Sequence, residues 1–423
     1  MLQIAYIKDN KETVLAGLEK KNFKDAEAVI NQALDLDQNR KDAQKALDDV
    51  LATSNAMAKQ IGLLMREGKR DEAELAKAET SELKAKSKEL DELLKGYSNQ
   101  LQEVMWTIPN LPHESVPAGK TPEDNQETFS HGEMPTLHEG AKPHWDLIAE
   151  YDIIDFELGN KVTGAGFPFY KGKGAKIQRA LINFFLNEAS DAGYTEIQPP
   201  ILINEASGYG TGQLPDKEGQ MYEAQTDGLF LIPTAEVPLT NMFRGEIIKE
   251  AQLPIKVTGY TPCFRREAGS WGAHVRGLNR LHQFDKVEIV QVRKPEESYK
   301  ALDEMVEHVK NLLEKLELPY RMLRLCGGDM SFTAAITYDF EVYSAAQERW
   351  LEVSSVSNFE SYQANRLMLR HKVDGKTELL HTLNGSALAL PRILASLLEN
   401  NQTPEGIKIP KALQPYCGFD LIN

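Results

Sequence analysis

The chain has 423 residues, of which 41% are apolar and 26% charged, and a formal net charge of −15. Because a single hydrophobic core stops growing at roughly 250 to 300 residues, this length predicts two domains, and the composition excludes a chain dominated by disorder. No apolar run suits a signal peptide or a membrane span, and the three cysteines, Cys263, Cys326 and Cys417, are too few for a disulfide framework or a thiolate zinc site. These features favour a cytoplasmic protein that does not enter a membrane.

The first quarter of the chain has the clearest periodicity. Apolar and small residues recur at alternating steps of four and three, from Val29 to Leu64 and again from Ala73 to Val104. This spacing is the seam of a coiled coil, and Gly68 in the charged segment between the two runs predicts a helix end and a solvated tip. Two helices, each about 50 to 60 Å long, are expected to fold back on each other. A coiled coil between two chains is the alternative, since heptads alone do not specify the partner.

Charge is unevenly distributed along the chain. Residues 1–106 contain 17 Lys and Arg against 20 Asp and Glu, so this part is less acidic than the rest. A strongly acidic protein does not bind nucleic acid by bulk charge. Any RNA partner is therefore expected at the helical hairpin.

After Trp106 the coiled-coil pattern stops. Four prolines in residues 107–125 predict an extended connector. We expect a helical hairpin over 1–106, a Pro-rich linker over 107–143 and a larger body over 144–423.

Short β-rich runs alternate with helical stretches in the body. Consecutive strands with hairpin-sized gaps favour an α+β fold with a largely antiparallel sheet, not a doubly wound parallel one. The predicted strands include 229–233, 255–264, 281–290 and 378–384, and the predicted helices include 175–193 and 298–316.

Phosphate-binding loops are not recognisable in the sequence. The segment YKGKGAK, residues 170–176, lacks the first glycine and the Ser or Thr of a P-loop, and GAGFPF, residues 164–169, lacks the third glycine of a dinucleotide fold. A nucleotide would therefore have to be bound by other residues.

Two neighbouring segments offer such residues. If FRRE, residues 264–267, lies on a strand, Arg265 and Glu267 share one face, and Phe284, Lys286 and Glu288 share a face of the next strand. Together these side chains could stack on a purine and bind its phosphates. The plain alternatives are a surface ion pair and a core phenylalanine.

Three further polar segments each have an ordinary structural explanation as well. Thr234-Ala235-Glu236 could be a helix N-cap with an acid in the first turn. Glu352-Val353-Ser354-Ser355 could be a polar edge strand, and Asn384-Gly385-Ser386 could be a turn before the last helix.

In this order, the segments resemble the motifs of the class II aminoacyl-tRNA synthetases. GYTEIQPPIL, residues 193–202 with Pro200, resembles the first motif, which forms the dimer interface in that family. FRRE through the strand ending at Glu288 resembles the second motif, and NGSALALPR, residues 384–392 with Arg392, resembles the third. The TAE triplet, the HQFDKVE and EVSS runs and the preceding hairpin are similar to the seryl branch, across essentially the whole chain.

This resemblance implies an α+β fold in which a class II catalytic core follows a long antiparallel helical hairpin. It implies a ligase that uses ATP to activate L-serine as seryl-adenylate, releasing pyrophosphate, and then transfers serine to the 3′ end of tRNA(Ser), and also of tRNA(Sec). The hairpin would be an intramolecular arm that binds tRNA(Ser). Local cations would make its phosphate contacts, such as Arg66, Lys69 and Arg70 near the tip or Arg40 and Lys41 along the shaft. A homodimer would form through the segment around Pro200.

The resemblance also implies roles for individual residues. The expected catalytic residues are Arg265, on the α-phosphate and the substrate carboxylate, Glu352, and Arg392, on the γ-phosphate. Glu267 and Phe284 would bind adenine, and Glu352 and Ser355 would hold Mg²⁺, which prefers oxygen ligands. The ATP site would comprise Arg265, Glu267, Phe284, Glu352, Val353, Ser354, Ser355 and Arg392. The serine site would comprise Thr234, Ala235, Glu236, Arg265, Glu288 and Ser386.

Three local expectations follow from these roles. Strict alternation would put Glu352 and Ser355 on opposite faces of a strand, so the strand must bulge or end there if both serve. Pro391 stands where glycine is common in the family and predicts a helix that begins close to Leu390, or one that kinks. The segment from Trp271 to Val275 departs from the family pattern, which puts acceptor-stem contacts there in doubt.

Two other functions remain open at this point. A related activating enzyme, either another class II synthetase or an amino-acid carrier ligase, would share the ATP residues. A non-catalytic synthetase-like protein would bind RNA or a partner through its coiled coil.

Overall fold

A computed structural model describes residues 1–216, 218–268 and 276–423. The chain divides into two compact units, Met1–Glu19 with Phe23–Pro109 and Lys20–Asn22 with Asn110–Asn423. Within the described part of the chain, no helix combines the length and the apolar character that crossing a membrane requires. The predicted loop from Trp271 to Val275 lies outside the described residues.

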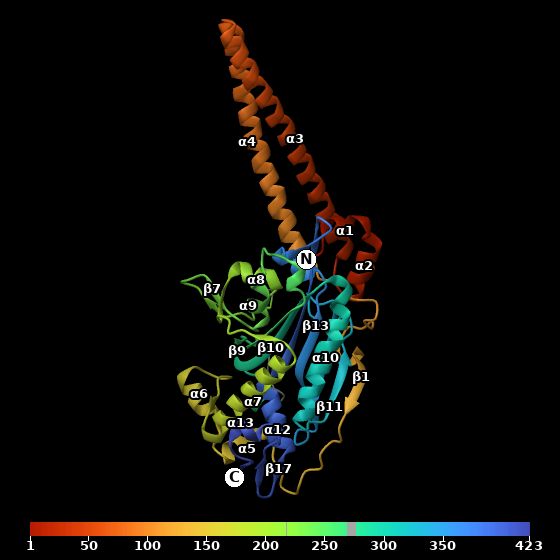
Figure 1. Ribbon diagram of the computed structural model, residues 1–423, viewed down its shortest axis with the longest axis vertical. Helices are drawn as coiled ribbons and strands as arrows, with labels where there is room; N and C mark the ends of the chain where they lie inside the picture. Colours follow the sequence, from red (N-terminus) through yellow and green to blue (C-terminus); the bar gives the residue numbers. More distant parts are fainter. Residues whose placement is uncertain (217, 269–275) are drawn as a thin grey trace. The chain divides into compact units, whose positions relative to one another are not determined.

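The first unit is helical. Two short helices, α1 (Ile4–Asp9) and α2 (Lys11–Lys20), precede the long helices α3 (Ala26–Arg66) and α4 (Arg70–Thr107), which pack against each other. Gly68 has a φ of 75° in the turn between them, a conformation that glycine adopts without strain. The predicted intramolecular hairpin is therefore confirmed, and Figure 1 shows its two helices side by side.

The predicted seams form the contact between the two long helices. Ala33 and Leu47 of α3 and Ala73 and Leu101 of α4 are buried. Asp37 is also buried there, and its carboxylate pairs with Arg40 at 2.9 Å and Lys41 at 2.6 Å. Small seam residues let the helices approach closely, as the heptad pattern predicts.

An eight-stranded sheet forms the centre of the second unit, in the order β1-β11-β12-β13-β16-β10-β9-β4. Its pairs are antiparallel except for β4 and β9, so the prediction of a largely antiparallel sheet is confirmed. The strands are β1 (Gln126–His131), β4 (Thr195–Glu196), β9 (Ile255–Phe264), β10 (Gln283–Arg293), β11 (Tyr320–Arg324), β12 (Ile336–Ser344), β13 (Arg349–Asn358) and β16 (His381–Ala389). The edge strand β1 comes from the stretch 107–143 that was predicted as a linker.

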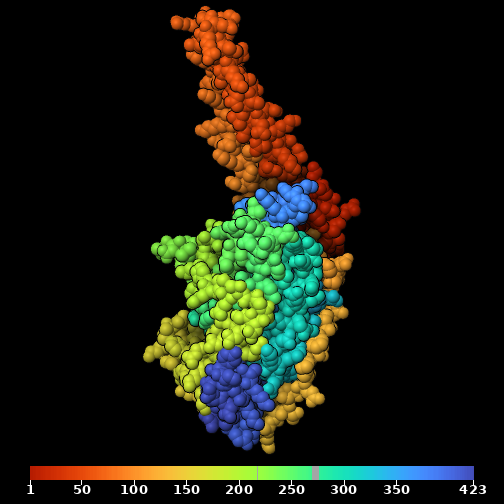
Figure 2. Space-filling view, in the orientation of Figure 1, coloured from red at the N-terminus to blue at the C-terminus, as the bar shows by residue number. Residues whose placement is uncertain are grey.

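Three helices pack on this sheet: α7 (Gly172–Asp191), α10 (Ser298–Lys315) and α12 (Leu390–Asn400). The main core lies between them and the strands, and strand alternation turns Val287 and Ile289 of β10 into it. On the other face of the sheet, Val290 packs with Ala235 and Leu239. The space-filling view shows α10 on the surface of this unit and the C-terminal segment beside α7 (Figure 2).

Smaller elements surround the sheet. The remaining helices are α5 (His144–Glu150), α6 (Phe156–Val162), α8 (Glu205–Thr211), α9 (Glu236–Asn241), α11 (Tyr362–Leu367) and α13 (Gln414–Cys417). The remaining strands are β2 (Ile154–Asp155), β3 (Phe169–Tyr170), β5 (Leu202–Asn204), β6 (Glu223–Ala224), β7 (Leu229–Leu231), β8 (Ile247–Ile248), β14 (Arg370–Val373), β15 (Lys376–Leu379), β17 (Gln402–Thr403), β18 (Gly406–Lys408) and β19 (Leu421–Ile422).

Some predicted boundaries are wrong. The strand predicted over 378–384 is divided, because β15 ends at Leu379 in a small three-stranded sheet and β16 begins at His381 in the main sheet. The turn considered for Asn384-Gly385-Ser386 is instead the middle of β16. Glu352 to Ser355 belong to β13, an inner strand of the sheet, but these four residues pair only along β12, because the pairing of β13 with β16 begins at Val356.

Candidate active site

A cavity of about 170 Å³ opens where β10, β13 and β16 meet the start of α12. Eight of the predicted site residues line it: Arg265, Glu267, Phe284, Glu352, Val353, Ser354, Ser386 and Arg392. The other lining residues are Leu278, Asn279, Arg280, Leu281, Lys286, Ala389 and Pro391. Segments separated by more than a hundred residues in the sequence therefore contribute to one site.

Arg265 and Phe284 lie beside each other among the residues that line the cavity. The Arg265 guanidinium carbon lies 5.2 Å from the centre of the Phe284 ring, within the range of a cation–π contact. Its Nε donates to the Pro233 carbonyl at 3.4 Å, and its backbone N–H donates to the His282 carbonyl at 2.9 Å. These contacts hold a cation beside an aromatic plate.

The strand predicted through FRRE is wrong beyond Phe264, where β9 ends. Glu267 has a φ of 50°, in the left-handed region that a strand does not use. Its carboxylate pairs with Arg280 and not with Arg265, so the surface pair considered for Arg265 and Glu267 is also wrong. Both residues nevertheless line the cavity, because the chain turns after the strand.

A buried polar cluster adjoins the cavity at Lys286. The Lys286 Nζ donates to Thr234 Oγ1 at 2.8 Å and pairs with Glu288 Oε2 at 2.8 Å, while Thr234 Oγ1 donates to Glu288 Oε2 at 3.2 Å. All three residues are buried. Glu288 is also the partner of Ser386 across the β10–β16 pair. Two of the expected serine-binding residues, Thr234 and Glu288, therefore meet around the Lys286 ammonium group.

Glu236 lies in the first turn of α9, beside this cluster. Its backbone N–H donates to Thr234 Oγ1 at 3.2 Å, but the N-cap position of α9 is Ala235 and not Thr234, so of the alternative considered for the TAE triplet only the acid in the first turn is found. Burial and the nearby Glu288 charge raise the pKa of Glu236 to about 7, although Gln363 donates to its carboxylate at 2.6 Å. This acid can change its charge near neutral pH.

The side chain of Ala235 has a different place. Its methyl group is fully buried and packs with Leu239, Val257 and Val290. It lies on the core side of the triplet and shapes the site only through the backbone between Thr234 and Glu236.

β13 bulges beside the cavity. Glu341 of β12 faces Glu352 and Phe340 faces Ser354, so the register shifts and Val353 is the extra residue. The predicted irregularity between Glu352 and Ser355 is confirmed. Ser355 hydrogen-bonds the Asp339 carboxyl group, whose pKa is raised by burial and by the nearby Glu352 charge. The Oδ1 atom of Asp339 is buried and has no partner among the described residues.

Arg392 lies in the first turn of α12, which begins at Leu390 as expected from Pro391. Its Nε donates to the Asn279 carbonyl at 3.0 Å, and one terminal nitrogen donates to the Glu352 carbonyl at 2.8 Å. These bonds fix a second guanidinium, besides that of Arg265, among the groups that line the cavity.

Sequence reasoning missed several contributors. Gln363 and Asp339 come from α11 and β12, and no motif marks them. The alternation of Phe284, Lys286 and Glu288 did place Lys286 on the same face of β10 as Phe284, which also lines the cavity, but it did not assign Lys286 a role. Asn279 and Arg280 follow the segment outside the described residues and line the cavity.

Comparisons with known proteins show the family to which this chain belongs. Residues 1–112 match the family described as the seryl-tRNA synthetase N-terminal domain, and residues 220–401 match the tRNA synthetase class II core domain (G, H, P, S and T). A serine–tRNA ligase from Salinibacter ruber is 49% identical over 426 residues, covering 100% of this chain and 99% of the relative.

Solved structures give the same result. A seryl-tRNA synthetase from Pyrococcus horikoshii, complexed with ATP, is 31% identical with a TM-score of 0.92, over 100% of this chain and 99% of that one. A cytoplasmic serine–tRNA ligase from Naegleria fowleri, complexed with AMP, is 26% identical with a TM-score of 0.86 over the same shares. With both family models and full-length relatives in agreement, this chain belongs to the seryl-tRNA synthetases, the class II ligases that attach serine to tRNA.

Proposed function

We propose that the cavity holds ATP between Arg265 and Arg392, with L-serine against the cluster of Thr234, Lys286 and Glu288. The single observation that carries this proposal is the convergence of two fixed guanidinium groups and a buried polar cluster on one cavity. Phe284 offers a stacking surface for adenine, and Glu267 lines the same cavity.

This arrangement suits adenylate formation. The serine carboxylate is already a nucleophile, so in-line attack on the α-phosphate needs no general base, only positioning and charge stabilisation. Arg265 would draw the carboxylate and the α-phosphate together against their mutual repulsion. Arg392 would hold the γ-phosphate, so that pyrophosphate leaves in line.

The buried cluster also explains a preference for serine. A pocket built to hydrogen-bond a hydroxyl rejects an analogue without it by about 10⁴ to 10⁵, because its own polar groups are left unpaired. Glu236 and Glu288 are carboxylates that can accept from the serine ammonium and hydroxyl. Alanine would leave these acceptors unsatisfied.

The residues at the β13 bulge fit Mg²⁺. Glu352 is half exposed, Ser355 supplies a hydroxyl, and Asp339 adds a carboxyl oxygen without a partner among the described residues. Oxygen donors suit this hard cation, which is usually held by one or two carboxylates together with substrate phosphates. Bound Mg²⁺ would neutralise phosphate charge there.

The hairpin is proposed to bind tRNA(Ser), and also tRNA(Sec). Of the five cations considered for phosphate contacts, Arg40 and Lys41 are paired with Asp37, and Lys69 is paired with Glu67 at 2.9 Å. Arg66 and Arg70 are exposed at the tip. They are the two strongest candidates for phosphate contacts.

A homodimer through the segment around Pro200 is proposed as well. Ile201 and Leu202 are 38% and 42% exposed, and β4, just before this segment, is the edge strand of the main sheet. An apolar pair beside an unpaired strand edge is typical of an interface. Sedimentation equilibrium distinguishes the 47.4 kDa monomer from a dimer.

A cytoplasmic location stays a prediction from the sequence.

An arginine pair tests the proposed site. Arg265→Ala is expected to lower serine-dependent pyrophosphate exchange by at least about 10³-fold, because it removes the cation that joins the two anions. Arg266→Ala is the matched control, since this neighbouring arginine is exposed and is not among the residues that line the cavity. Equal exchange in the two variants would contradict the assignment.

A further inference from the structure

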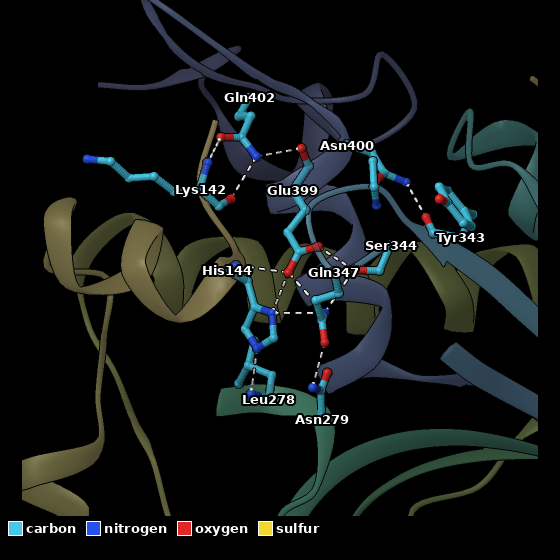
Figure 3. A network of polar contacts seen from close by, with 11 residues as sticks. Lys142, His144, Leu278, Asn279, Tyr343, Ser344, Gln347, Glu399, Asn400 and Gln402 are labelled. Carbon is cyan, nitrogen blue, oxygen red and sulfur yellow. Dashed lines mark hydrogen bonds and ion pairs between the residues drawn. The ribbon is translucent and has the colours of Figure 1, made fainter. Parts of the chain in front are cut away.

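A buried hydrogen-bond network lies behind the cavity, at the C-terminal end of α12 (Figure 3). Its centre is the Glu399 carboxylate, which is fully buried. Glu399 Oε1 accepts from the His144 backbone N–H at 2.9 Å, from His144 Nδ1 at 2.7 Å and from Gln347 Nε2 at 3.0 Å, and Oε2 accepts from the Ser344 hydroxyl. Burial alone would raise the pKa of Glu399, but the hydrogen bonds from His144 and Ser344 lower it below its ordinary value. The centre of the network is therefore an anion.

His144 connects this anion to the wall of the cavity. Its Nε2 accepts from the Leu278 backbone N–H at 2.9 Å, so Nε2 carries no proton and Nδ1 donates to Glu399. The ring is thus neutral and held at both nitrogens. Gly277 permits this approach, because it has a φ of 65° and a Cβ there would lie 2.3 Å from His144 Nε2. The backbone of 277–278 is fixed against the imidazole.

Gln347 makes a second connection from the same carboxylate. Its Nε2 donates to Glu399, and its Oε1 accepts from Asn279 Nδ2 at 2.8 Å. The two connections end on adjacent residues, Leu278 and Asn279, which both line the cavity.

The network then returns to α12. The Asn279 carbonyl accepts from Arg392 Nε at 3.0 Å, and Arg392 lies seven residues before Glu399, two turns away on the same helix. A closed ring therefore runs from Glu399 through Gln347 and Asn279 to Arg392. Three hydrogen bonds between buried or half-buried groups link these residues and helix α12 closes the ring, so the guanidinium has little freedom to rotate.

We propose that His144 and Gln347, anchored on Glu399, are positioning residues for ATP. They fix the 277–279 segment, and the Asn279 carbonyl in turn orients the Arg392 guanidinium toward the nucleotide. This inference rests on the proposed placement of ATP in the cavity. It adds residues from α5 and from the turn after β12, neither of which lines the cavity.

The matched variants are Gln347→Met and Asn400→Ala. Methionine keeps the length of Gln347 but removes its bonds to Glu399 and Asn279. Asn400 adjoins Glu399 and makes structural bonds of the same kind, from Nδ2 to the Tyr343 carbonyl at 2.7 Å and from the Ala345 N–H to Oδ1 at 3.0 Å. These two bonds do not involve residues 277–279.

The readout is the dissociation constant of ATP, measured by calorimetry without an amino acid and corrected for the folded fraction. Gln347→Met is expected to weaken ATP binding about tenfold, because the misplaced guanidinium meets the phosphate less well. Asn400→Ala is expected to stay within about twofold of the parent chain. Equal ATP affinity in the two variants overturns the proposal.

A double-mutant cycle separates positioning from general destabilisation. If Gln347 acts through Arg392, Gln347→Met weakens ATP binding much less in an Arg392→Ala background than in the parent chain. An undiminished effect in that background overturns the proposal.

The outcomes also separate this inference from the proposed function. A parent chain that does not bind ATP contradicts both. A parent chain that binds ATP, with Gln347→Met binding equally well, contradicts only the positioning role.

Discussion

At the scale of single residues, the acid–base state of Glu236 has a direct consequence for substrate binding. Its pKa of about 7 reflects burial first and the Glu288 charge second, with Lys286 and hydrogen bonds from Gln363 and Asn384 acting in the opposite direction. Below pH 7 the group is therefore mostly neutral and attracts the serine ammonium weakly.

This gives a pH prediction. The KM for serine in pyrophosphate exchange should rise about tenfold from pH 8 to pH 6, because the ionised fraction of Glu236 falls through its pKa. In Glu236→Gln the KM should be higher at pH 8 and nearly independent of pH over this range. An unchanged pH profile in that variant would mean that another group is responsible.

The pH dependence that Glu236 gives to folding stability is opposite to that of most carboxyl groups, whose pKa is lowered by folding. Since the pKa of Glu236 is raised from 4.5 to about 7, the folded chain holds this proton more tightly than the unfolded chain does. The contribution of Glu236 to stability is therefore present below about pH 4.5 and is lost as the pH rises through 7.

Asp339 provides a test of the Mg²⁺ site. Replacement by Asn keeps the shape but removes the carboxyl group that would hold Mg²⁺, so about tenfold more Mg²⁺ should be needed for half-maximal exchange at saturating ATP. Glu341→Gln is the control, since Glu341 lies two residues away on β12 and pairs with Arg321 at 2.6 Å. A Mg²⁺ requirement that shifts equally in both variants would exclude a specific role for Asp339.

At the scale of elements, regular structure was predictable where one periodicity runs without interruption. The strand over 255–264 agrees with β9 to the residue, and the two seams agree with α3 and α4. Prediction failed where tertiary structure overrides alternation. Glu267 leaves the strand in a left-handed conformation, and the β15–β16 break at Leu380 moves the chain from one sheet to another.

The residues of the candidate site likewise fall into those that the sequence predicted and those that it did not. Residues inside short motifs, such as Arg265 and Arg392, could be assigned by resemblance. Gln363 and Asp339 could not, because they reach the site only through the packing of α11 and β12 against distant strands. The bulge in β13 could be predicted only conditionally, because strict alternation allows Glu352 and Ser355 to act together only if the strand bulges or ends there.

The hairpin gives a prediction at this scale. Replacing both Arg66 and Arg70 with Ala should lower kcat/KM for tRNA(Ser) charging by about tenfold or more while leaving pyrophosphate exchange unchanged, because exposed cations at the tip would contact phosphates. Arg40→Ala is the control, because this arginine is engaged with Asp37. If charging is lost only in the control, the shaft and not the tip is the binding surface.

At the scale of the whole molecule, length and pattern predicted two parts and a fold class, but not the chemistry. The proposed chemistry depends on side chains that line one cavity and come from the turn after β9, from β10, β13 and β16, and from α12. Their order in the chain made the resemblance specific, and full-length relatives such as the Salinibacter ruber ligase agree with it.

Amino-acid-dependent pyrophosphate exchange, run with each of the twenty amino acids in turn, tests the central claim most directly. We predict rapid exchange with serine, little with threonine and none with alanine, because the buried polar cluster requires a hydroxyl partner. Exchange with a different amino acid, or no exchange with serine, would contradict it.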